Sequence, residues 1–338
     1  MALHSRCAQR GITLVILPEV LTFFGLSREF RDAGYFETEQ AQRIASALKP
    51  AIEAGHLIAL TGITGCGKTT TARRIRQDLE KEWKILVATN LAVDKERVKL
   101  STLMEAIFAD ISTDKEVTLP MQAELRERRL RDLIQCRSRP VALFIDEAHD
   151  LHPKTMVGLK RLVEVVQEGG AVLAIVLVGL PRLRVNLRRP AMKEIGARIT
   201  MLTLESPQGS GLPFLMWLLE RCKRSEVAIT DIFTEEAMTM LVDRLTTPLQ
   251  LIHYAWRALE EAYVAGQKPV DAETVEEVLA PDLDGLEPRL TRLGYPVKLL
   301  CEALNTRPAE IRAFLRGRLA PGRTQELHQE LLKLGVVA

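Results

Sequence analysis

The glycine-rich segment of residues 62–69 has the spacing that most directly predicts chemistry. It fits the pattern G-x-x-x-x-G-K-[S/T], with an apolar stretch before it and a helical one after it. Glycines let the backbone wrap phosphate groups, and the N-terminus of the next helix adds favourable partial charge. We therefore expect bound ATP, with Lys68 at the β- and γ-phosphates and the Thr69 hydroxyl on Mg²⁺. The predicted nucleotide-binding residues are Gly62, Ile63, Thr64, Gly65, Cys66, Gly67, Lys68, Thr69 and Thr70.

Two adjacent acids, Asp146 and Glu147, end the apolar run 141–145. We expect Asp146 to hold Mg²⁺ and Glu147 to polarise an attacking water, which predicts an ATPase. The alternative is a strand that ends in a solvated acidic turn, and the phosphate loop in the same chain counts against it. Residues 146–149, Asp-Glu-Ala-His, also match the DEAH box motif of some helicases. Such helicases need two strand-rich lobes, so we instead expect His149 to cap or pack at the following helix.

The cysteines predict thiols rather than a structural framework. None of the five lies in a CxxC pair, which argues against disulfides and a zinc site and favours a reducing, cytoplasmic location. Cys66 lies inside the phosphate loop, and we expect the loop amides to lower its thiol pKa. Alkylation of Cys66 would then block ATP binding.

The elements that position these motifs alternate between strand and helix. Strands that are apolar throughout favour a parallel sheet with helices on both faces, which is an α/β fold. The predicted strands are residues 57–60, 83–89, 141–145, 171–178 and 199–204. The predicted helices between them are residues 69–80, 100–108, 121–136 and 153–167.

Amphipathic helices replace strands after residue 207. They predict a helical lid, and two further short helices at 297–304 and 309–316 predict a C-terminal module that resembles a helix-turn-helix. The predicted lid helices are residues 213–224, 234–245, 248–266 and 272–279. The predicted division is an N-terminal lead-in (1–35), a nucleotide-binding α/β core (36–207), an α-helical lid (208–281) and a basic helical module (287–338).

Composition limits the possible partners. With 338 residues and 47% hydrophobic content, the chain can bury a sizeable core. The net charge of +2 means that nucleic-acid contact must come from a local patch. The longest apolar run, residues 171–180, is too short to span a bilayer, so we expect no membrane contact.

Two motifs followed by a helical lid make the chain resemble AAA+ ATPases, and more narrowly the ExeA-like and TnsC/MuB-like branch. The further segments that carry this resemblance are Phe23–Leu26, Gly34–Thr38, Val178–Leu183, Arg198-Ile199 and Thr247–Gln250. The resemblance implies rings or filaments in which a neighbour's arginine reaches the γ-phosphate. Arg198 is the first candidate for this arginine, followed by Arg189 and Arg188; a solvated surface arginine is the alternative for each.

Two positions depart from the family pattern. Gly179-Leu180 stand where many relatives place a polar sensor residue, and Leu249-Gln250 stand where many place a sensor arginine. The resemblance therefore implies slow hydrolysis, which suits a switch better than a motor.

Two basic segments predict contact with double-stranded DNA. Lys95, Arg97 and Lys99 follow the second predicted strand, where DNA-binding relatives line the inside of a ring; a mixed-charge helix start is the alternative. Arg312 and Arg316 lie on the second tail helix, where a small bundle that docks a protein is the alternative.

The preferred hypothesis is an ATP-dependent, DNA-binding regulator of transposition, with DNA recombination as its process. It would form a homo-oligomer on DNA with ATP and recruit or activate a transposase, with a target-selection protein as a further partner. The alternatives are an ExeA-like ATPase in secretion or envelope assembly, and a signalling ATPase with a protein-binding tail. Secretion members usually carry a transmembrane segment, and none is predicted here.

Overall fold

The computed structural model describes residues 13–81, 85–90, 98–112, 120, 122–189, 192, 196, 198–205, 210–279, 285–315, 317–333 and 336. They belong to two compact units. One unit is drawn from residues 1–36 and 206–284, and the other from residues 37–205 and 285–338. Within the described ranges, no helix is both long and apolar enough to cross a membrane.

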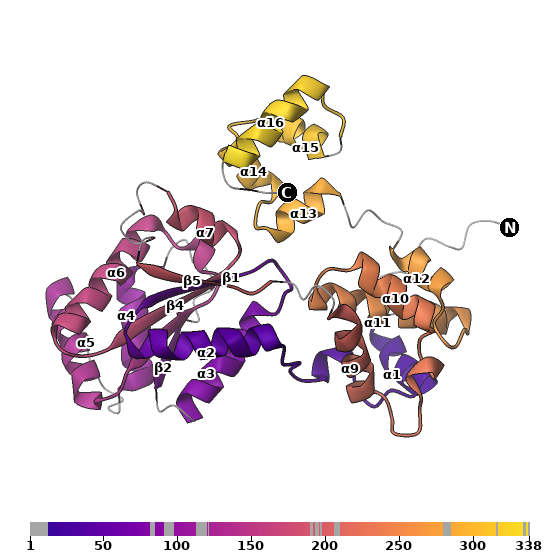
Figure 1. Ribbon diagram of the computed structural model, residues 1–338, viewed down its shortest axis with the longest axis horizontal. Coiled ribbons are helices and arrows are strands. Elements are labelled where there is room, and N and C mark those ends of the chain that lie inside the picture. Colours follow the sequence, from indigo (N-terminus) through magenta and orange to yellow (C-terminus); the bar gives the residue numbers. More distant parts are fainter. Residues whose placement is uncertain are drawn as a thin grey trace. The chain divides into compact units, whose positions relative to one another are not determined.

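The second unit contains a five-stranded parallel sheet with the order β2-β3-β4-β1-β5 (Figure 1). Every residue of β1, β3 and β4 is buried, which explains their uninterrupted apolar sequences. The central strand β1 pairs with both β4 and β5, so the loop after it lies at the carboxyl edge between neighbours. The strands are β1 (Leu57–Thr61), β2 (Leu86–Asn90), β3 (Val141–Ile145), β4 (Leu173–Gly179) and β5 (Ile199–Thr203).

Helices cover both faces of this sheet, which confirms the predicted α/β fold (Figure 1). Alternate residues of β3 separate the two cores: Ala142 and Phe144 pack with α2 and α3, whereas Leu143 faces the helices of the other side. The first side has α2 (Glu39–Glu53) and α3 (Lys68–Lys81). The other has α4 (Leu100–Ile111), α5 (Ala123–Arg137), α6 (Pro153–Glu168) and α7 (Arg182–Leu187).

The first unit is a helical bundle that includes the N-terminal lead-in. Helix α1 joins it through Tyr263, which donates to Glu19 at 2.8 Å, and Lys268, which donates to the Phe23 carbonyl at 3.0 Å. The helices α1 (Thr13–Phe24), α9 (Gly211–Cys222), α10 (Glu235–Arg244), α11 (Pro248–Ala265) and α12 (Ala272–Leu279) share one buried core with the short turns η1 (Phe30–Asp32) and η4 (Ile229–Asp231).

The Thr247–Gln250 segment has a structural role at the start of α11. The Thr247 hydroxyl accepts from the Gln250 amide, and the Gln250 side chain accepts from the Thr247 amide, which forms a capping box. The Gln250 side chain is therefore used to cap the start of α11.

Four helices form the C-terminal module around a core of their own, which includes Leu290, Ile311 and Leu327. They are α13 (Leu286–Arg292), α14 (Val297–Ala303), α15 (Pro308–Leu315) and α16 (Pro321–Lys333). Arg323 forms ion pairs with Glu310 and Glu326 at 2.7 and 2.8 Å, and the hydrogen bonds raise its pKa. Its charge is thus balanced locally, which reduces the basic character expected of the module.

Candidate nucleotide-binding and catalytic site

The loop between β1 and α3 needs its glycines. Gly65 and Gly67 have φ angles of 81° and 97°, in the left-handed region that side chains disfavour. At Gly62, a Cβ atom would lie 2.4 Å from the Leu204 carbonyl oxygen. The loop therefore keeps its backbone amides uncovered by side chains at these positions, as a phosphate-binding loop requires.

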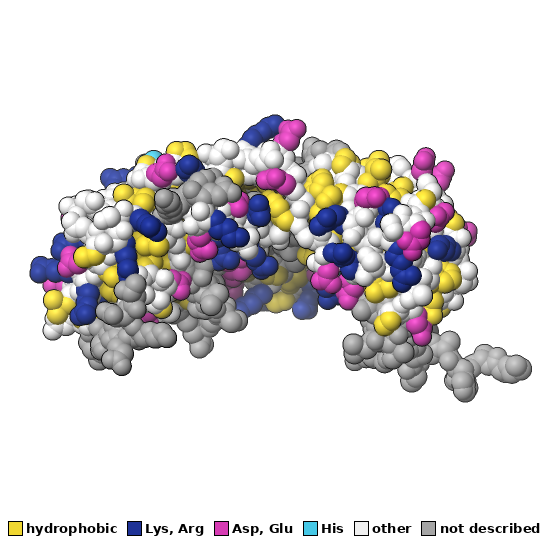
Figure 2. All heavy atoms as spheres, turned by 90° about the horizontal axis from the view of Figure 1, so that it is seen from below, with side chains coloured by type: hydrophobic (Ala, Val, Ile, Leu, Met, Phe, Trp, Pro, Cys, Tyr) yellow, Lys and Arg dark blue, Asp and Glu magenta, His cyan; other side chains and the backbone are white. Residues whose placement is uncertain are grey.

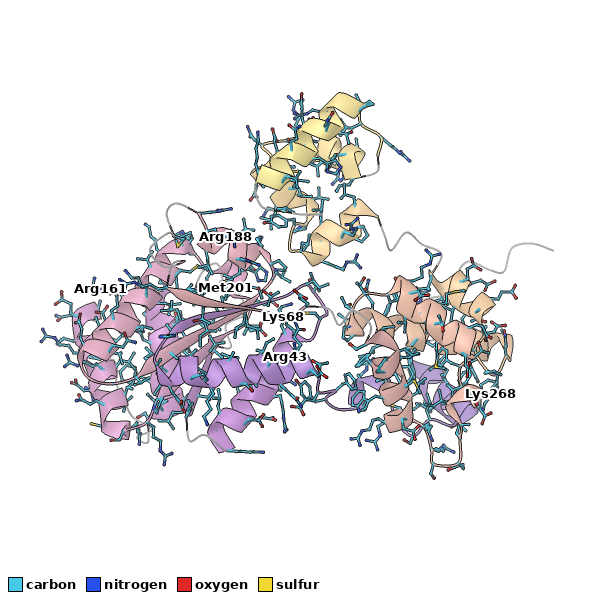
Figure 3. The ribbon with its side chains drawn as sticks, viewed as in Figure 1. Arg43, Lys68, Arg161, Arg188, Met201 and Lys268 are labelled. Carbon is cyan, nitrogen blue, oxygen red and sulfur yellow. The ribbon has the colours of Figure 1, made fainter. Side chains whose placement is uncertain are left out.

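Lys68 begins α3 and is buried, with 7% of its surface exposed (Figure 3). Its Nζ donates to the carbonyl oxygen of Ile63 in the same loop at 2.7 Å. The ammonium group has three N–H donors, so donors besides the one on Ile63 can reach phosphate oxygens. The residue is thus placed at the predicted site, with its charge directed onto the loop.

Thr69 and Asp146 come together from separate elements. The Thr69 hydroxyl donates to Asp146 Oδ2 at 2.9 Å, although the residues are 77 positions apart. Asp146 Oδ1 also accepts from the Glu147 amide at 2.9 Å, which fixes the carboxylate. A hydroxyl and a carboxylate are hard oxygen ligands that suit Mg²⁺, so this pair fits the predicted metal site.

Glu147 has an unusual backbone for a residue with a side chain. Its φ and ψ angles are 53° and 34°, in the left-handed region. Such a conformation costs on the order of 1–3 kcal/mol and is found preferentially at functional sites. The side chain is exposed, and one carboxylate oxygen lies 3.4 Å from His149 Nδ1.

His149 is a site residue whose contacts the sequence did not predict. It lies in the short turn η2 (Ala148–Asp150), and its Nδ1 accepts from the Leu180 amide at 3.3 Å. A Cβ on Gly179 would lie 3.2 Å from this nitrogen, so the glycine leaves room for the imidazole. His149 packs against the end of β4, as expected of a packing residue, whereas His152 caps the next helix by accepting from the Lys154 amide.

The surroundings of His149 favour the neutral imidazole. Burial is the largest cause and lowers the pKa of His149 to about 4. The charge of Asp150 opposes this shift, and the charges of Arg182 and Lys68 add to it. The ion pair between Arg182 and Asp150 ties η2 to α7. A glycine at the end of the fourth apolar run, Gly179, and a histidine two residues after Glu147 were the signal in the sequence that could have revealed this contact.

The prediction for Cys66 is wrong. Its thiol is buried, and burial raises the pKa more than the charge of Lys68 and the hydrogen bonds lower it. The loop amides and the helix N-terminus do not compensate for the loss of hydration. Cys66 therefore acts as a small packing residue of the loop.

The candidate trans-acting arginines lie on the surface. Arg198 immediately precedes β5, is 65% exposed and donates to Glu164 at 2.6 Å. Arg189 and Arg188 are exposed at the end of α7, where Figure 3 labels Arg188. A role toward a neighbouring subunit would require Arg198 to exchange Glu164 for another partner.

The predicted DNA-contacting residues are only partly described. Lys99 is exposed at the start of α4, and Arg312 is exposed on α15. Lys95, Arg97 and Arg316 lie outside the described residues. Over the face shown in Figure 2, Lys and Arg side chains alternate with Asp and Glu side chains, so this face carries no large field of one sign.

Comparisons with known proteins agree with this architecture. A family model described as an AAA domain matches residues 52–187. The chain is also 30% identical over 148 residues to the general secretion pathway protein A of Aeromonas hydrophila. That match covers 44% of this chain and only 26% of the relative.

Three solved structures share the fold. The first is the ORC2 protein of Aeropyrum pernix in its ADPNP-ADP complexes, with a TM-score of 0.59 and 15% identity over 93% of this chain and 91% of that chain. The second is Cdc6p from Pyrobaculum aerophilum, with a TM-score of 0.53 and 16% identity over 94% of this chain and 90% of that chain. The third is the RuvB Holliday junction branch migration motor of Thermotoga maritima, with a TM-score of 0.50 and 20% identity over 82% of this chain and 86% of that chain. The chain thus has an α/β fold of the P-loop AAA+ type, and identities this low show the fold alone.

Proposed function

We propose that this chain binds Mg²⁺·ATP at residues 62–69 and hydrolyses it. The observation that carries the proposal is the 2.9 Å contact between Thr69 and Asp146, which joins the phosphate loop to the acidic end of β3. Lys68 would pair with the β- and γ-phosphates, and Thr69 and Asp146 would hold Mg²⁺. Bound Mg²⁺ would supply positive charge to the phosphate oxygens.

Glu147 is the proposed general base. Its left-handed backbone sets it apart from Asp146, whose carboxylate is directed to Thr69. Glu147 can therefore orient an attacking water while Asp146 holds Mg²⁺. The segment after β4 offers the Leu180 amide rather than a polar side chain, and that amide is already bonded to His149. This supports slow, switch-like turnover.

At the next level we propose an ATP-dependent, DNA-binding regulator of transposition in the cytoplasm. Exposed Arg312 on a short helix after a tight turn supports DNA contact, as does the fold likeness to a branch migration motor of Holliday junctions. The protein would assemble as a homo-oligomer on double-stranded DNA, recruit a transposase and disassemble after hydrolysis. Arg198 or Arg189 would act at the neighbouring subunit's nucleotide.

An ATPase that serves secretion is the second candidate. The similarity to the general secretion pathway protein A supports it, and that match spans 148 residues. The match covers only 26% of that relative, so a secretion role of this chain stays a proposal.

Duplex DNA binding separates the two candidates. With a slowly hydrolysed ATP analogue, log affinity for DNA should fall linearly with log salt, and little base preference is expected. Arg312→Ala should weaken binding and reduce the salt slope by about 1. Arg43→Ala removes the same charge from α2, where Arg43 pairs with Glu39, and should leave the slope unchanged. No binding at low salt by a protein that is assembled with the analogue would exclude the DNA-dependent role and favour secretion.

A further inference from the structure

The last turn of helix α13 lies against the phosphate loop. The Thr64 amide donates to the Arg292 carbonyl oxygen at 3.1 Å, and the Thr64 hydroxyl donates to the same oxygen at 3.2 Å. The residue after this helix end makes a second contact, since a Cβ on Gly294 would lie 3.0 Å from Leu180 Cδ1. Helix α13 therefore contacts both the loop proposed to bind phosphates and the segment that follows β4.

The contact with Thr64 uses main-chain atoms of α13. The Gly294 amide donates to the Thr291 carbonyl and the Tyr295 amide to the Leu290 carbonyl, both at 2.9 Å. Gly294 has a φ angle of 94°, so this is the Schellman arrangement that ends a helix at a left-handed glycine. The Arg292 carbonyl is left for the loop, and a change of the Arg292 side chain keeps this acceptor.

The charges of α13 are divided along the helix. Its acidic residue, Glu287, is in the first turn, and its basic residues, Arg289 and Arg292, are in the last turn. Arg289 is exposed and Arg292 is half-buried, and neither forms an ion pair with another described residue. The carbonyl end of a helix carries a negative charge of only about half a unit. The end of α13 that meets the loop is therefore positive overall.

The loop itself brings a positive charge to the same place. Lys68 Nζ donates to the Ile63 carbonyl oxygen at 2.7 Å, and the amide of the same peptide group, that of Thr64, donates to Arg292. An ammonium group has three N–H donors, so Lys68 can bind phosphate oxygens without leaving Ile63. Phosphates bound to this loop would therefore meet positive charge from both α3 and α13.

The acids at this edge of the sheet do not cancel that charge. Asp150 forms an ion pair with Arg182, and Asp146, bonded to Thr69, is a proposed Mg²⁺ ligand. Glu147 then leaves one negative charge against those of Lys68, Arg289 and Arg292. An anion bound at the loop lowers the repulsion among these three cations.

We propose that the C-terminal module, residues 285–338, is a cis-acting part of the nucleotide site, in which Arg289 and Arg292 attract the phosphates of ATP. The inference rests on the proposed ATP site. Because the interaction is attractive, the docked module strengthens ATP binding, and by linkage bound ATP strengthens docking to the same extent. The module thus has a role toward the nucleotide in addition to any contact with DNA.

Neutral glutamine at both positions tests the role of the two charges. Arg289→Gln/Arg292→Gln removes them and keeps the carbonyl that binds Thr64. With each charge on the order of 10 Å from the phosphates, affinity for a fluorescent, slowly hydrolysed ATP analogue should fall about 3- to 30-fold. Affinity for the corresponding ADP analogue should fall less, because that ligand carries less negative charge. Arg289→Lys/Arg292→Lys should restore most of the affinity, because both charges return.

A second pair of arginines in the module provides the matched control. Arg307 and Arg318 are exposed and flank α15. Arg307→Gln/Arg318→Gln removes the same charge from the module without changing α13, and affinity for the ATP analogue should stay within about twofold of wild type.

Release of the module tests the contact itself. Gly294→Val places side-chain atoms against Leu180 and should lower the affinity for the ATP analogue by a factor similar to that of the glutamine pair. Added to that pair, it should have little further effect, because both changes remove the same interaction. Gly317→Val is the control: Gly317 also has positive φ, at 64°, and a Cβ there would meet nothing within 4 Å.

The outcomes separate the inference from the function on which it rests. Unchanged affinity of Arg289→Gln/Arg292→Gln for the ATP analogue would overturn the inference, and so would an equal loss in the control pair or an equal loss for the ADP analogue. Higher affinity of Gly294→Val would also overturn it, because the docked module would then oppose binding. If the wild-type chain fails to bind the analogue, the proposed ATP site is itself wrong.

Discussion

Replacement of His149 by glutamine should remove an acid-sensitive element from the nucleotide-binding unit. The imidazole is buried between η2 and the end of β4, and its Nδ1 accepts from the Leu180 amide. Protonation would eliminate this acceptor and place a charge in a buried position, a cost that the nearby carboxylate of Asp150 offsets only in part. Glutamine can supply an oxygen acceptor and does not titrate.

The folded and unfolded pKa values of His149 determine how the stability changes with pH. The folded-state pKa of His149 is lowered to about 4, from the ordinary value of 6.5. Between these values the unfolded chain binds a proton that the folded chain does not. The stabilisation is therefore complete above pH 6.5 and is lost as the pH falls toward 4. At pH 5.0 the loss is about 2 kcal/mol by linkage, and it approaches about 3 kcal/mol at lower pH.

Urea unfolding followed by circular dichroism at pH 7.5 and pH 5.0 measures this loss. The wild-type unit that contains His149 should lose about 2 kcal/mol more than His149→Gln between the two pH values. His56→Gln, in the same unit but exposed before β1, controls for the loss of an imidazole and should behave as wild type. An equal loss in wild type and His149→Gln would refute the assignment of His149 as a buried neutral base.

Three further predictions concern the nucleotide site. Lys68→Ala should weaken ATP binding about 10- to 100-fold in a fluorescence titration. Glu147→Gln should still bind ATP but should lower the turnover rate about 10²- to 10⁴-fold. Hydrolysis by Glu147→Gln at the wild-type rate would contradict the role of Glu147 as the general base. Because burial raises the pKa of Cys66, little of its thiol is ionised at pH 8. Iodoacetamide should therefore modify the exposed Cys136 before Cys66 in a mass-spectrometric time course. Equal alkylation rates of the two cysteines would argue against the burial of Cys66. Arg198→Ala should bind ATP but lose hydrolysis, and mixing it with Glu147→Gln should restore some activity; no rescue in verified mixed assemblies would count against a role in trans.

Much of the nucleotide-binding fold was readable from local patterns. Apolar runs predicted β1, β3 and β4, because a strand covered on both faces has no polar side to mark. The edge strands β2 and β5 contain polar residues, and their prediction also rested on the alternation of strands with helices. The lead-in was less readable. Helix α1 packs in the bundle of the lid helices through contacts such as Tyr263 with Glu19, which join residues 244 positions apart. Contacts at that separation leave no periodicity to detect.

The sequence alone determined the phosphate loop and the acids after β3, because their chemistry depends on short spacings and on glycines at fixed positions. Tertiary structure decided how those groups are used. It buried Cys66 and so reversed the expected direction of its pKa shift, and it placed His149 against the Leu180 amide. It also brought the Arg292 carbonyl to the Thr64 amide across 228 positions. Desolvation and the partner of a backbone carbonyl are properties of the packed chain, and residue type and spacing do not encode them.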